Sequence, residues 1–192
     1  EILQNGGIFI DIGANFGLFT CQAAAVNKSV HVIAIEPNYR IVGPLMNNIK
    51  VNGLQNRVQV FNLAVSDGVH LVGLEQPVVE NMGTTMISEQ TGTLNVLSCS
   101  LDFICRQLKG TEIELIKIDI EGNEFADFKE FDFSAYRDKK IILEDNENAK
   151  MQLPQLIAFF NSNGFACADV SGKAVNAGKP SLIDNNIWFF KK

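Results

Sequence analysis

The sequence predicts an α/β fold in which helices cover both faces of a mostly parallel sheet. Two observations lead to this expectation. Short runs rich in Ile, Val and Leu alternate along the chain with segments that carry apolar residues at helical spacing, a pattern typical of strands buried on both sides. The first of these runs leads through a turn with two glycines into a helical segment, as many strand–helix–strand units begin.

The first third of the chain predicts three strands joined by two helices. The strands are expected at residues 7–12, 30–36 and 57–65, where β-branched and apolar residues form continuous runs. Small and apolar residues after Asn15 predict a first helix that ends near Asn27. The second helix is indicated by an i, i+3, i+4, i+7 stripe made up of Val42, Leu45, Met46 and Ile49.

The middle of the chain changes character before the strand pattern returns. Turn residues break the segment of about 66–98 into short alternating pieces, which predicts a hairpin-like insertion. A short helix is expected over 100–108, with Ser100 as its N-cap. Two more strands are then expected at 113–120 and 140–145.

The end of the chain predicts one helix and two strands. The helix begins near Pro154 and carries an apolar stripe. Runs at 165–170 and 186–191 are expected to pair antiparallel, because no helix fits between them. The stripe consists of Leu153, Leu156, Ile157 and Phe160.

Composition restricts the class of protein. The 192 residues suffice for one domain with a substantial core, so we expect residues 1–192 to form a single domain. The net charge of −6 and the absence of a Lys/Arg run predict no nucleic-acid partner, and no apolar stretch is long enough for a membrane span. Four cysteines without disulfide or zinc-ligand spacing indicate a cytoplasmic chain with reduced thiols. Because the first residue is Glu, we expect a domain cut from a longer protein.

The turn after the first strand carries the clearest functional signal. Its glycines are Gly13 and Gly17 with Asn15 between them, which departs from the dinucleotide pattern G-x-G-x-x-G. Asp11 precedes the turn at the carboxyl edge of the sheet. A carboxylate there would repel a pyrophosphate but would attract an ammonium or sulfonium group.

A second acid, Glu36, ends the second strand and is followed by Pro37. An acid at this place accepts hydrogen bonds from both hydroxyls of a ribose. A ligand with a ribose, an adenine and a cationic amino-acid tail suits both acids, and S-adenosylmethionine is such a ligand. An NAD-dependent oxidoreductase, a non-catalytic cofactor-binding module and a purely structural glycine turn are the alternatives.

Acidic residues also gather at the ends of the fourth and fifth strands. Asp119 and Glu121 follow Lys117 at alternate positions, and Glu144 ends the neighbouring strand. One of these carboxylates could act as a general base. Alternatively, Asp119 and Glu144 could hold Mg²⁺ together with Asp145 or Asn146. A carboxylate two residues on, or one from a neighbouring strand, is the natural partner of a buried Lys117. The structural alternative is that Lys117 and Glu144 form a buried pair, and for Lys117 we favour it.

With these motifs in place, the chain resembles the FkbM family of S-adenosylmethionine-dependent methyltransferases over about three quarters of its length. The resemblance implies a class I methyltransferase fold, with a mostly parallel seven-stranded sheet and an antiparallel last strand. It also implies O-methylation of a hydroxyl on a small molecule, a sugar, a lipid or a secondary metabolite. The motifs that carry it are FIDIGANFGLFT, AIEPN, NNIKVNG, NLAVSD, NMGTT, SLDF, KIDIEGNE and ILEDN.

The resemblance assigns the cofactor contacts by position. The methionine end would lie against the glycine turn, with Asp11 near its ammonium group. Glu36 would bind the ribose, and Asn62 and Ala64 would flank the adenine. The full set of expected cofactor residues is Asp11, Gly13, Ala14, Asn15, Gly17, Glu36, Pro37, Asn38, Asn62 and Ala64.

Overall fold

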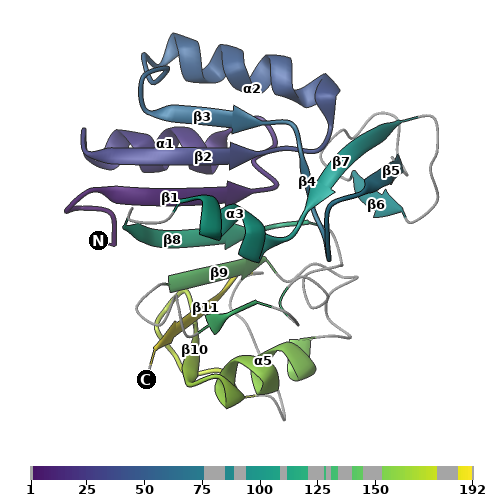
Figure 1. Cartoon of the computed structure of the whole chain (residues 1–192). Helices are drawn as coiled ribbons and strands as arrows, with labels where there is room; N and C mark the ends of the chain where they lie inside the picture. The colour runs from purple at the N-terminus through teal and green to yellow at the C-terminus, as the bar shows by residue number, and fades with distance from the viewer. Residues whose placement is uncertain are drawn as a thin grey trace.

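A seven-stranded sheet forms the centre of the molecule (Figure 1). The computed structural model describes residues 2–75, 85–88, 94–108, 112–120, 128, 131–133, 140–144, 153–176 and 186–191. The strands of the sheet are β1 (Gly7–Ile12), β2 (Val30–Ile35), β3 (Val58–Phe61), β8 (Ile113–Ile118), β9 (Lys140–Glu144), β10 (Phe165–Asp169) and β11 (Asn186–Lys191). Their spatial order is β10-β11-β9-β8-β1-β2-β3.

The direction of the strands agrees with the sequence prediction. Strands β3, β2, β1, β8 and β9 pair parallel, whereas β11 pairs antiparallel with both β9 and β10. The strand order turns back between β1 and β8, so the helical connections leave the sheet in opposite directions there. This point at the carboxyl edge of an open α/β sheet is where ligands bind.

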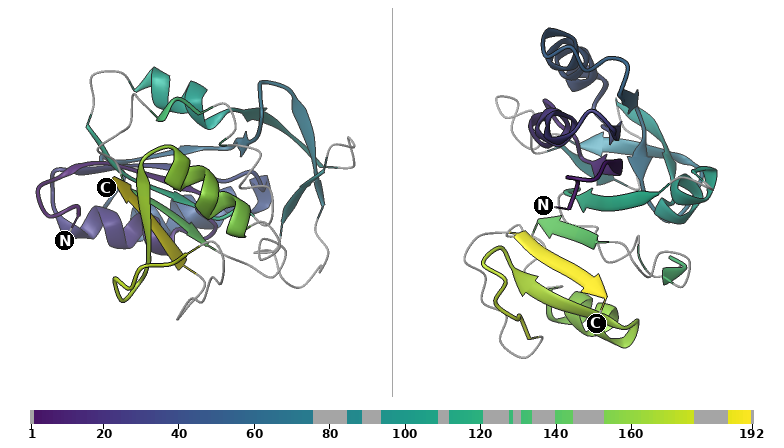
Figure 2. Two further views of the ribbon diagram at one scale, coloured as in Figure 1. Left: turned by 90° about the horizontal axis from the view of Figure 1, so that it is seen from below. Right: turned by 90° about the vertical axis from the view of Figure 1, so that its left-hand side faces the viewer.

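Helices cover both faces of the sheet (Figure 2). The described helices are α1 (Leu18–Val26), α2 (Tyr39–Val51), α3 (Leu101–Gln107) and α5 (Leu153–Ser162). Alternate residues of β1 belong to different cores: Phe9 packs with the α1 and α2 side, and Ile10 packs with the α3 and α5 side. Both faces are therefore buried, which explains why the strands read as continuous apolar runs.

The helix stripe predicted for α2 was only partly right. Leu45 and Ile49 are buried as expected, but Met46 is 57% exposed and Val42 is half-buried. The helix instead buries Ile41, one turn before Leu45. The buried residues therefore follow an i, i+4, i+8 row along the helix, which is narrower than the predicted stripe.

The strand predicted at 57–65 is two strands in two different sheets. β3 ends at Phe61, and β4 (Ala64–Val65) pairs parallel with β7 (Asn95–Cys99). The break lies at Asn62, whose side-chain amide donates to the backbone carbonyls of Glu36 and Pro37. These bonds turn the chain away from β2, so the ladder of the large sheet does not continue.

The turn-rich segment contributes to a small second sheet beyond the carboxyl edge of the large one (Figure 1). Its order is β4-β7-β5-β6, in which β5 (Leu71–Glu75) pairs antiparallel with β7 and with β6 (Met86–Ser88). Residues 76–84 and 89–93 lie outside the described part of this segment. The expectation from its turn residues was a hairpin-like insertion over about 66–98, and the described β5 and β6 pair antiparallel.

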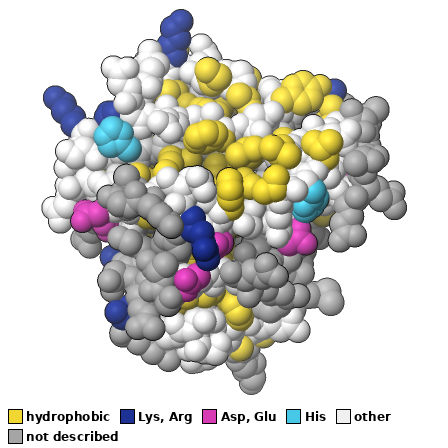
Figure 3. Space-filling view, in the orientation of Figure 1, with side chains coloured by type: hydrophobic (Ala, Val, Ile, Leu, Met, Phe, Trp, Pro, Cys, Tyr) yellow, Lys and Arg dark blue, Asp and Glu magenta, His cyan; other side chains and the backbone are white. Residues whose placement is uncertain are grey.

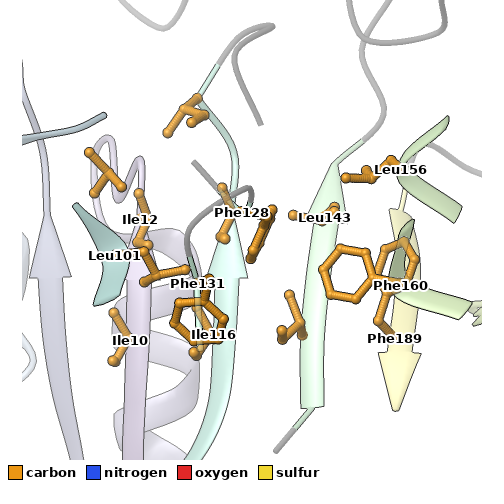
Figure 4. Close-up of a cluster of buried hydrophobic side chains, with 14 of the residues drawn as sticks. Ile10, Ile12, Leu101, Ile116, Phe128, Phe131, Leu143, Leu156, Phe160 and Phe189 are labelled. Atoms are coloured by element: carbon orange, nitrogen blue, oxygen red, sulfur yellow. The ribbon is translucent and has the colours of Figure 1, made fainter. Parts of the chain in front are cut away.

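Aromatic packing forms much of the larger core (Figure 4). Phe128, Phe131 and Phe133 are buried, and their rings contact one another. Phe160 of α5 stacks on Phe189 of β11 with ring centroids 4.0 Å apart. This core ties α5 and the antiparallel strands to the parallel part of the sheet.

The surface has an apolar area of its own. Figure 3 shows apolar side chains gathered on the face that Figure 1 presents. Leu97 of β7 and Phe103 of α3 are each about half exposed, at 46% and 47%. Among the described residues no helix is long and apolar enough to cross a membrane, and the four cysteines, all of them described, form no disulfide.

Candidate functional site

The turn after β1 depends on residues that tolerate a left-handed backbone. Gly13 and Gly17 have φ of 72° and 86°, and Asn15 has φ of 50°. A Cβ on Gly13 would lie only 1.8 Å from the backbone oxygen of Asp119. The turn therefore packs directly against the end of β8, and only glycine leaves room for this contact.

Backbone hydrogen bonds attach the same turn to β2. The N–H groups of Gly13 and Ala14 both donate to the carbonyl of Ile35 at 3.0 Å. Ala14 is buried beneath the turn, and a Cβ on Gly17 would lie 2.5 Å from Leu45 of α2. Ala14 and Gly17 thus shape the turn from inside.

Both carboxylate oxygens of Glu36 are fixed by backbone hydrogen bonds. Its Oε2 accepts the N–H of Asn15 and its Oε1 accepts the N–H of Asn38, both at 2.8 Å. The residue is 4% exposed. Burial raises the pKa of Glu36, and the two backbone hydrogen bonds partly oppose that rise. Each oxygen keeps a further lone pair with which it can accept a hydrogen bond from a ligand.

Asn38 connects this acid to the second sheet. Its Oδ1 accepts the N–H of Arg40 at 3.1 Å and so caps α2. Its Nδ2 donates to the hydroxyl of Thr85 at 3.0 Å, across 47 residues of sequence. Asn38 is 1% exposed, so its role in the described structure is to hold the edge together.

A pocket opens between the turn, Glu36 and the second sheet. Its polar lining includes Asn15, Glu36 and Asp119, and its apolar lining comes from both sheets and from α2. The complete lining is Ile12, Gly13, Asn15, Ile35, Glu36, Pro37, Ile41, Leu63, Val65, Thr85, Ile87, Asp119 and Ile120. A polar end next to an apolar wall suits a ligand with a sugar or an amino-acid group attached to a flat ring.

Asn62 and Ala64, which were expected at the adenine, do not line this pocket. Leu63 and Val65 do. Ala64 is buried in the core of the second sheet, and Asn62 holds the carbonyls of Glu36 and Pro37. Side chains alternate along a strand, so the change of sheet after Asn62 decided which residues face the pocket.

A buried ion cluster lies below the turn. Lys117 Nζ is 3.2 Å from Asp119 Oδ2 and 3.8 Å from Asp11 Oδ1. Thr20 of α1 donates its hydroxyl hydrogen bond to Asp11 Oδ2 at 2.6 Å. Lys117 therefore has one carboxylate partner two residues on, Asp119, and one on the neighbouring strand β1, Asp11.

The two acids of this cluster differ in their access to the pocket. Asp11 is 1% exposed and is not part of the pocket lining, whereas the side chain of Asp119 is 26% exposed and lines it. Burial raises the pKa of Asp11 more than Lys117 and the Thr20 hydroxyl lower it. Asp11 therefore supports the turn from beneath, and Asp119 is the member of the cluster that faces the pocket.

Two buried oxygens at this edge lack a hydrogen bond within the described structure. They are Oδ1 of Asn15 and Oδ1 of Asp11. An unpaired buried acceptor is costly unless a ligand supplies a donor. Asn15 Oδ1 lies on a pocket-lining residue, so a ligand that carries N–H donors matches it chemically.

The remaining acids of the predicted catalytic group are only partly described. Glu144 ends β9. Because the register pairs Leu143 with Ile118, the backbones of Glu144 and Asp119 lie at the same edge of the sheet. Glu121 and Asp145 lie outside the described residues. Within the described part of the chain, no three His, Cys, Asp or Glu side chains are grouped to hold a metal ion.

Comparison with known proteins gives a family and several structural likenesses. A family model for the methyltransferase FkbM domain matches residues 11–167. Comparison with curated proteins gave no match. Among solved structures, methyltransferase FkbM from Methylobacillus flagellatus is similar at 16% identity and a TM-score of 0.62. That similarity covers 97% of this chain and 44% of the other, so this chain spans less than half the length of that protein.

Two further solved structures support the fold. An O-methyltransferase from Bacillus cereus, in complex with S-adenosylhomocysteine, is 14% identical with a TM-score of 0.55, over 100% of this chain and 76% of that one. Precorrin-6y C5,15-methyltransferase from Geobacter metallireducens is 14% identical with a TM-score of 0.51, over 97% and 81%. These likenesses agree with the seven-stranded fold, including its antiparallel last strand.

Proposed function

The chain belongs to the methyltransferase FkbM domain family, and from this premise we propose that it is an S-adenosylmethionine-dependent O-methyltransferase. The acceptor is a hydroxyl group of a small molecule, a sugar, a lipid or a secondary metabolite. One observation carries the proposal: the Glu36 carboxylate lines the pocket with each oxygen fixed by a backbone N–H group. Such a fixed pair of acceptors is suited to the two hydroxyls of a ribose.

The other pocket residues suit different parts of the cofactor. Leu63, Val65 and Ile87 offer an apolar wall for an adenine. At the opposite end, the unpaired Oδ1 of Asn15 and the carboxylate of Asp119 offer acceptors for the amino group of the methionine tail. Asp11 lies directly beneath and contributes negative charge without reaching the pocket.

The chain itself orients the cofactor and the acceptor and removes the proton of the acceptor hydroxyl. S-adenosylmethionine, when bound, supplies an electrophilic methyl group. Of the predicted catalytic acids Asp119, Glu121 and Glu144, Asp119 accepts from the amino group of the methionine tail, so we assign removal of the acceptor hydroxyl's proton to Glu121 or Glu144. In the metal-assisted version, Asp119 and Glu144 would hold Mg²⁺ and lower the pKa of that hydroxyl.

Calorimetry with S-adenosylhomocysteine and NAD tests the cofactor assignment on the chain as it stands. We expect S-adenosylhomocysteine to bind with a Kd in the micromolar range, about −8 kcal/mol, and NAD to bind at least about a hundredfold more weakly. Preferential binding of NAD, or binding of neither compound, would refute the assignment.

Turnover tests the reaction. With S-adenosylmethionine and a panel of sugar, lipid and polyketide alcohols, the Asp119→Asn and Glu144→Gln variants should lose at least about a hundredfold in turnover. Wild-type turnover in both variants would refute their catalytic role. Turnover that is indifferent to EDTA would remove the Mg²⁺ version, and cofactor binding without transfer to any acceptor would favour a non-catalytic module.

A further inference from the structure

Lys117 is an unusual residue for the centre of a parallel sheet. It lies on β8 opposite Asp11 of β1, and it is 2% exposed. A buried ammonium group costs several kcal/mol unless partners compensate for its lost hydration. Its partners are Asp119 Oδ2 at 3.2 Å, Asp11 Oδ1 at 3.8 Å and the ring of Phe19, whose centroid lies 4.9 Å from Nζ.

The charges of this cluster do not balance. Two carboxylates surround one ammonium group, so the cluster of Asp11, Lys117 and Asp119 has one negative charge in excess when both acids are ionised. Asp11 and Lys117 are closed off from the pocket, and Asp119 lines it. The excess charge therefore acts on a ligand through Asp119.

Asp119 is also tied to the glycine turn through its backbone. Its N–H donates to the carbonyl of Ile12 at 3.1 Å, and its own carbonyl occupies the space beside Gly13. These contacts fix the main chain, but they leave the carboxylate free to rotate. Within the described structure, the contact that fixes the carboxylate is the one with Lys117.

We propose that Lys117 is a positioning residue for the amino-acid end of the cofactor pocket: its ammonium group orients the Asp119 carboxylate toward the ligand's amino group and joins it to Asp11 beneath the glycine turn. The inference rests on the proposed function, because it takes the ligand's tail to lie beside Asn15 and Asp119. It gives Lys117 a role in binding, where a purely structural role would concern folding alone.

Two ligands separate these roles. S-adenosylhomocysteine carries the amino-acid tail, and methylthioadenosine keeps the adenine, ribose and thioether but lacks the tail. In calorimetry, Lys117→Met should weaken S-adenosylhomocysteine binding by at least about tenfold, while methylthioadenosine affinity stays within about threefold. Equal losses for both ligands would overturn the inference. A wild-type chain that binds neither ligand would instead refute the proposed function, and the inference with it.

A charge-balanced variant separates a loss of binding from a loss of folding. Lys117→Met leaves two buried carboxylates without a counter-charge, whereas Asp11→Asn/Lys117→Met removes one charge of each sign at nearly constant volume. We expect urea denaturation to show recovered stability in the double variant, with S-adenosylhomocysteine affinity still about tenfold below that of Asp11→Asn. Equal affinity in these two variants would show that Lys117 is only a counter-charge for Asp11.

A double-mutant cycle tests whether Lys117 acts through Asp119. If it does, Lys117→Met should cause no further loss of S-adenosylhomocysteine affinity in an Asp119→Asn background. Losses that multiply, so that the double variant binds as weakly as the product of the two single effects, would overturn the inference.

Discussion

Glu36 shows how one side chain can set the shape of a pocket edge. Because its two oxygens accept the N–H groups of Asn15 and Asn38, the glycine turn and the start of α2 are held at fixed positions around one carboxylate. A glutamine has one acceptor oxygen and one amide nitrogen. Its nitrogen would face a backbone donor and would leave that donor unpaired.

The first prediction follows from this geometry. Glu36→Gln should weaken S-adenosylhomocysteine and methylthioadenosine equally, by about tenfold to a hundredfold, because both ligands carry a ribose. Calorimetry measures both affinities. Glu75→Gln, the same substitution at the exposed end of β5, is the matched control and should bind as the wild type does. An effect on only one of the ligands would contradict a ribose contact.

The second prediction concerns Asp11 and pH. Burial raises the pKa of Asp11 above its ordinary 3.8, so between the unfolded-state and folded-state pKa values the folded chain holds a proton that the unfolded chain has released. The contribution of this proton to the free energy of unfolding therefore falls as pH rises from 3.8 through the folded-state pKa. Lys117, Asp119 and Thr20 surround the carboxyl group and share in setting that pKa.

An Asp11→Asn variant cannot titrate at this position. The difference in unfolding free energy between this variant and the wild type should shift in favour of the variant as pH is raised from about 4 to about 7. Urea denaturation across that range measures the difference. A shift in favour of the wild type would mean that Lys117 outweighs burial and lowers the pKa.

Single residues also mark how far the sequence could predict the site. The place of Glu36 at the pocket edge was predictable because it follows directly on a clear apolar strand, and the turn was predictable from its glycines. The roles of Thr20 and Asn62 were not, since hydrogen bonds across 9 and 26 residues leave no trace in spacing. Leu63 and Val65 were missed because their orientation depends on where the chain changes sheet.

Among the elements, the connection between β1 and α1 leaves no room for a side chain at Gly13. Its turn has to fit between the ends of β2 and β8, and the fit is possible because Gly13 has no side chain. Strands β1 and β11 were predicted to the residue, because long buried runs end at clear turn signals. The strand at 57–65 was not, because its apolar run continues through a change of sheet.

The third prediction tests this connection. Gly13→Ala should destabilise the fold by about 2–4 kcal/mol and abolish S-adenosylhomocysteine binding, because the added Cβ meets backbone that cannot yield. Gly53→Ala is the control: Gly53 also has a left-handed φ, of 68°, but has nothing within 4 Å of the added Cβ. It should cost only about 1–2 kcal/mol and leave binding unchanged. Equal costs for the two would show that φ alone matters.

In the whole molecule, the pocket and the aromatic packing lie in different parts of the sheet. The pocket lies at the carboxyl edge, whereas the aromatic part of the larger core joins α5, β10 and β11. The overall layering was predictable, since alternating strand and helix patterns admit few arrangements. The antiparallel pairing of β10 with β11 was predicted, because no helix fits between them, but the place of β11 beside β9 was not, because propensity contains no information on strand order.

The last prediction follows from this separation. Phe160 is fully buried and contacts Phe128, Phe133, Phe165 and Phe189, so Phe160→Ala should cost about 3–5 kcal/mol in urea denaturation. Phe103→Ala, at a site 47% exposed on α3, should cost less than about 1 kcal/mol. Under conditions where Phe160→Ala remains folded, its affinity for S-adenosylhomocysteine should stay within about threefold of the wild type, because the aromatic core contributes no residue to the pocket lining. A large loss of affinity in the folded variant would mean that the two ends of the sheet are coupled, and that the pocket depends on the packing of the whole sheet as well as on its own edge.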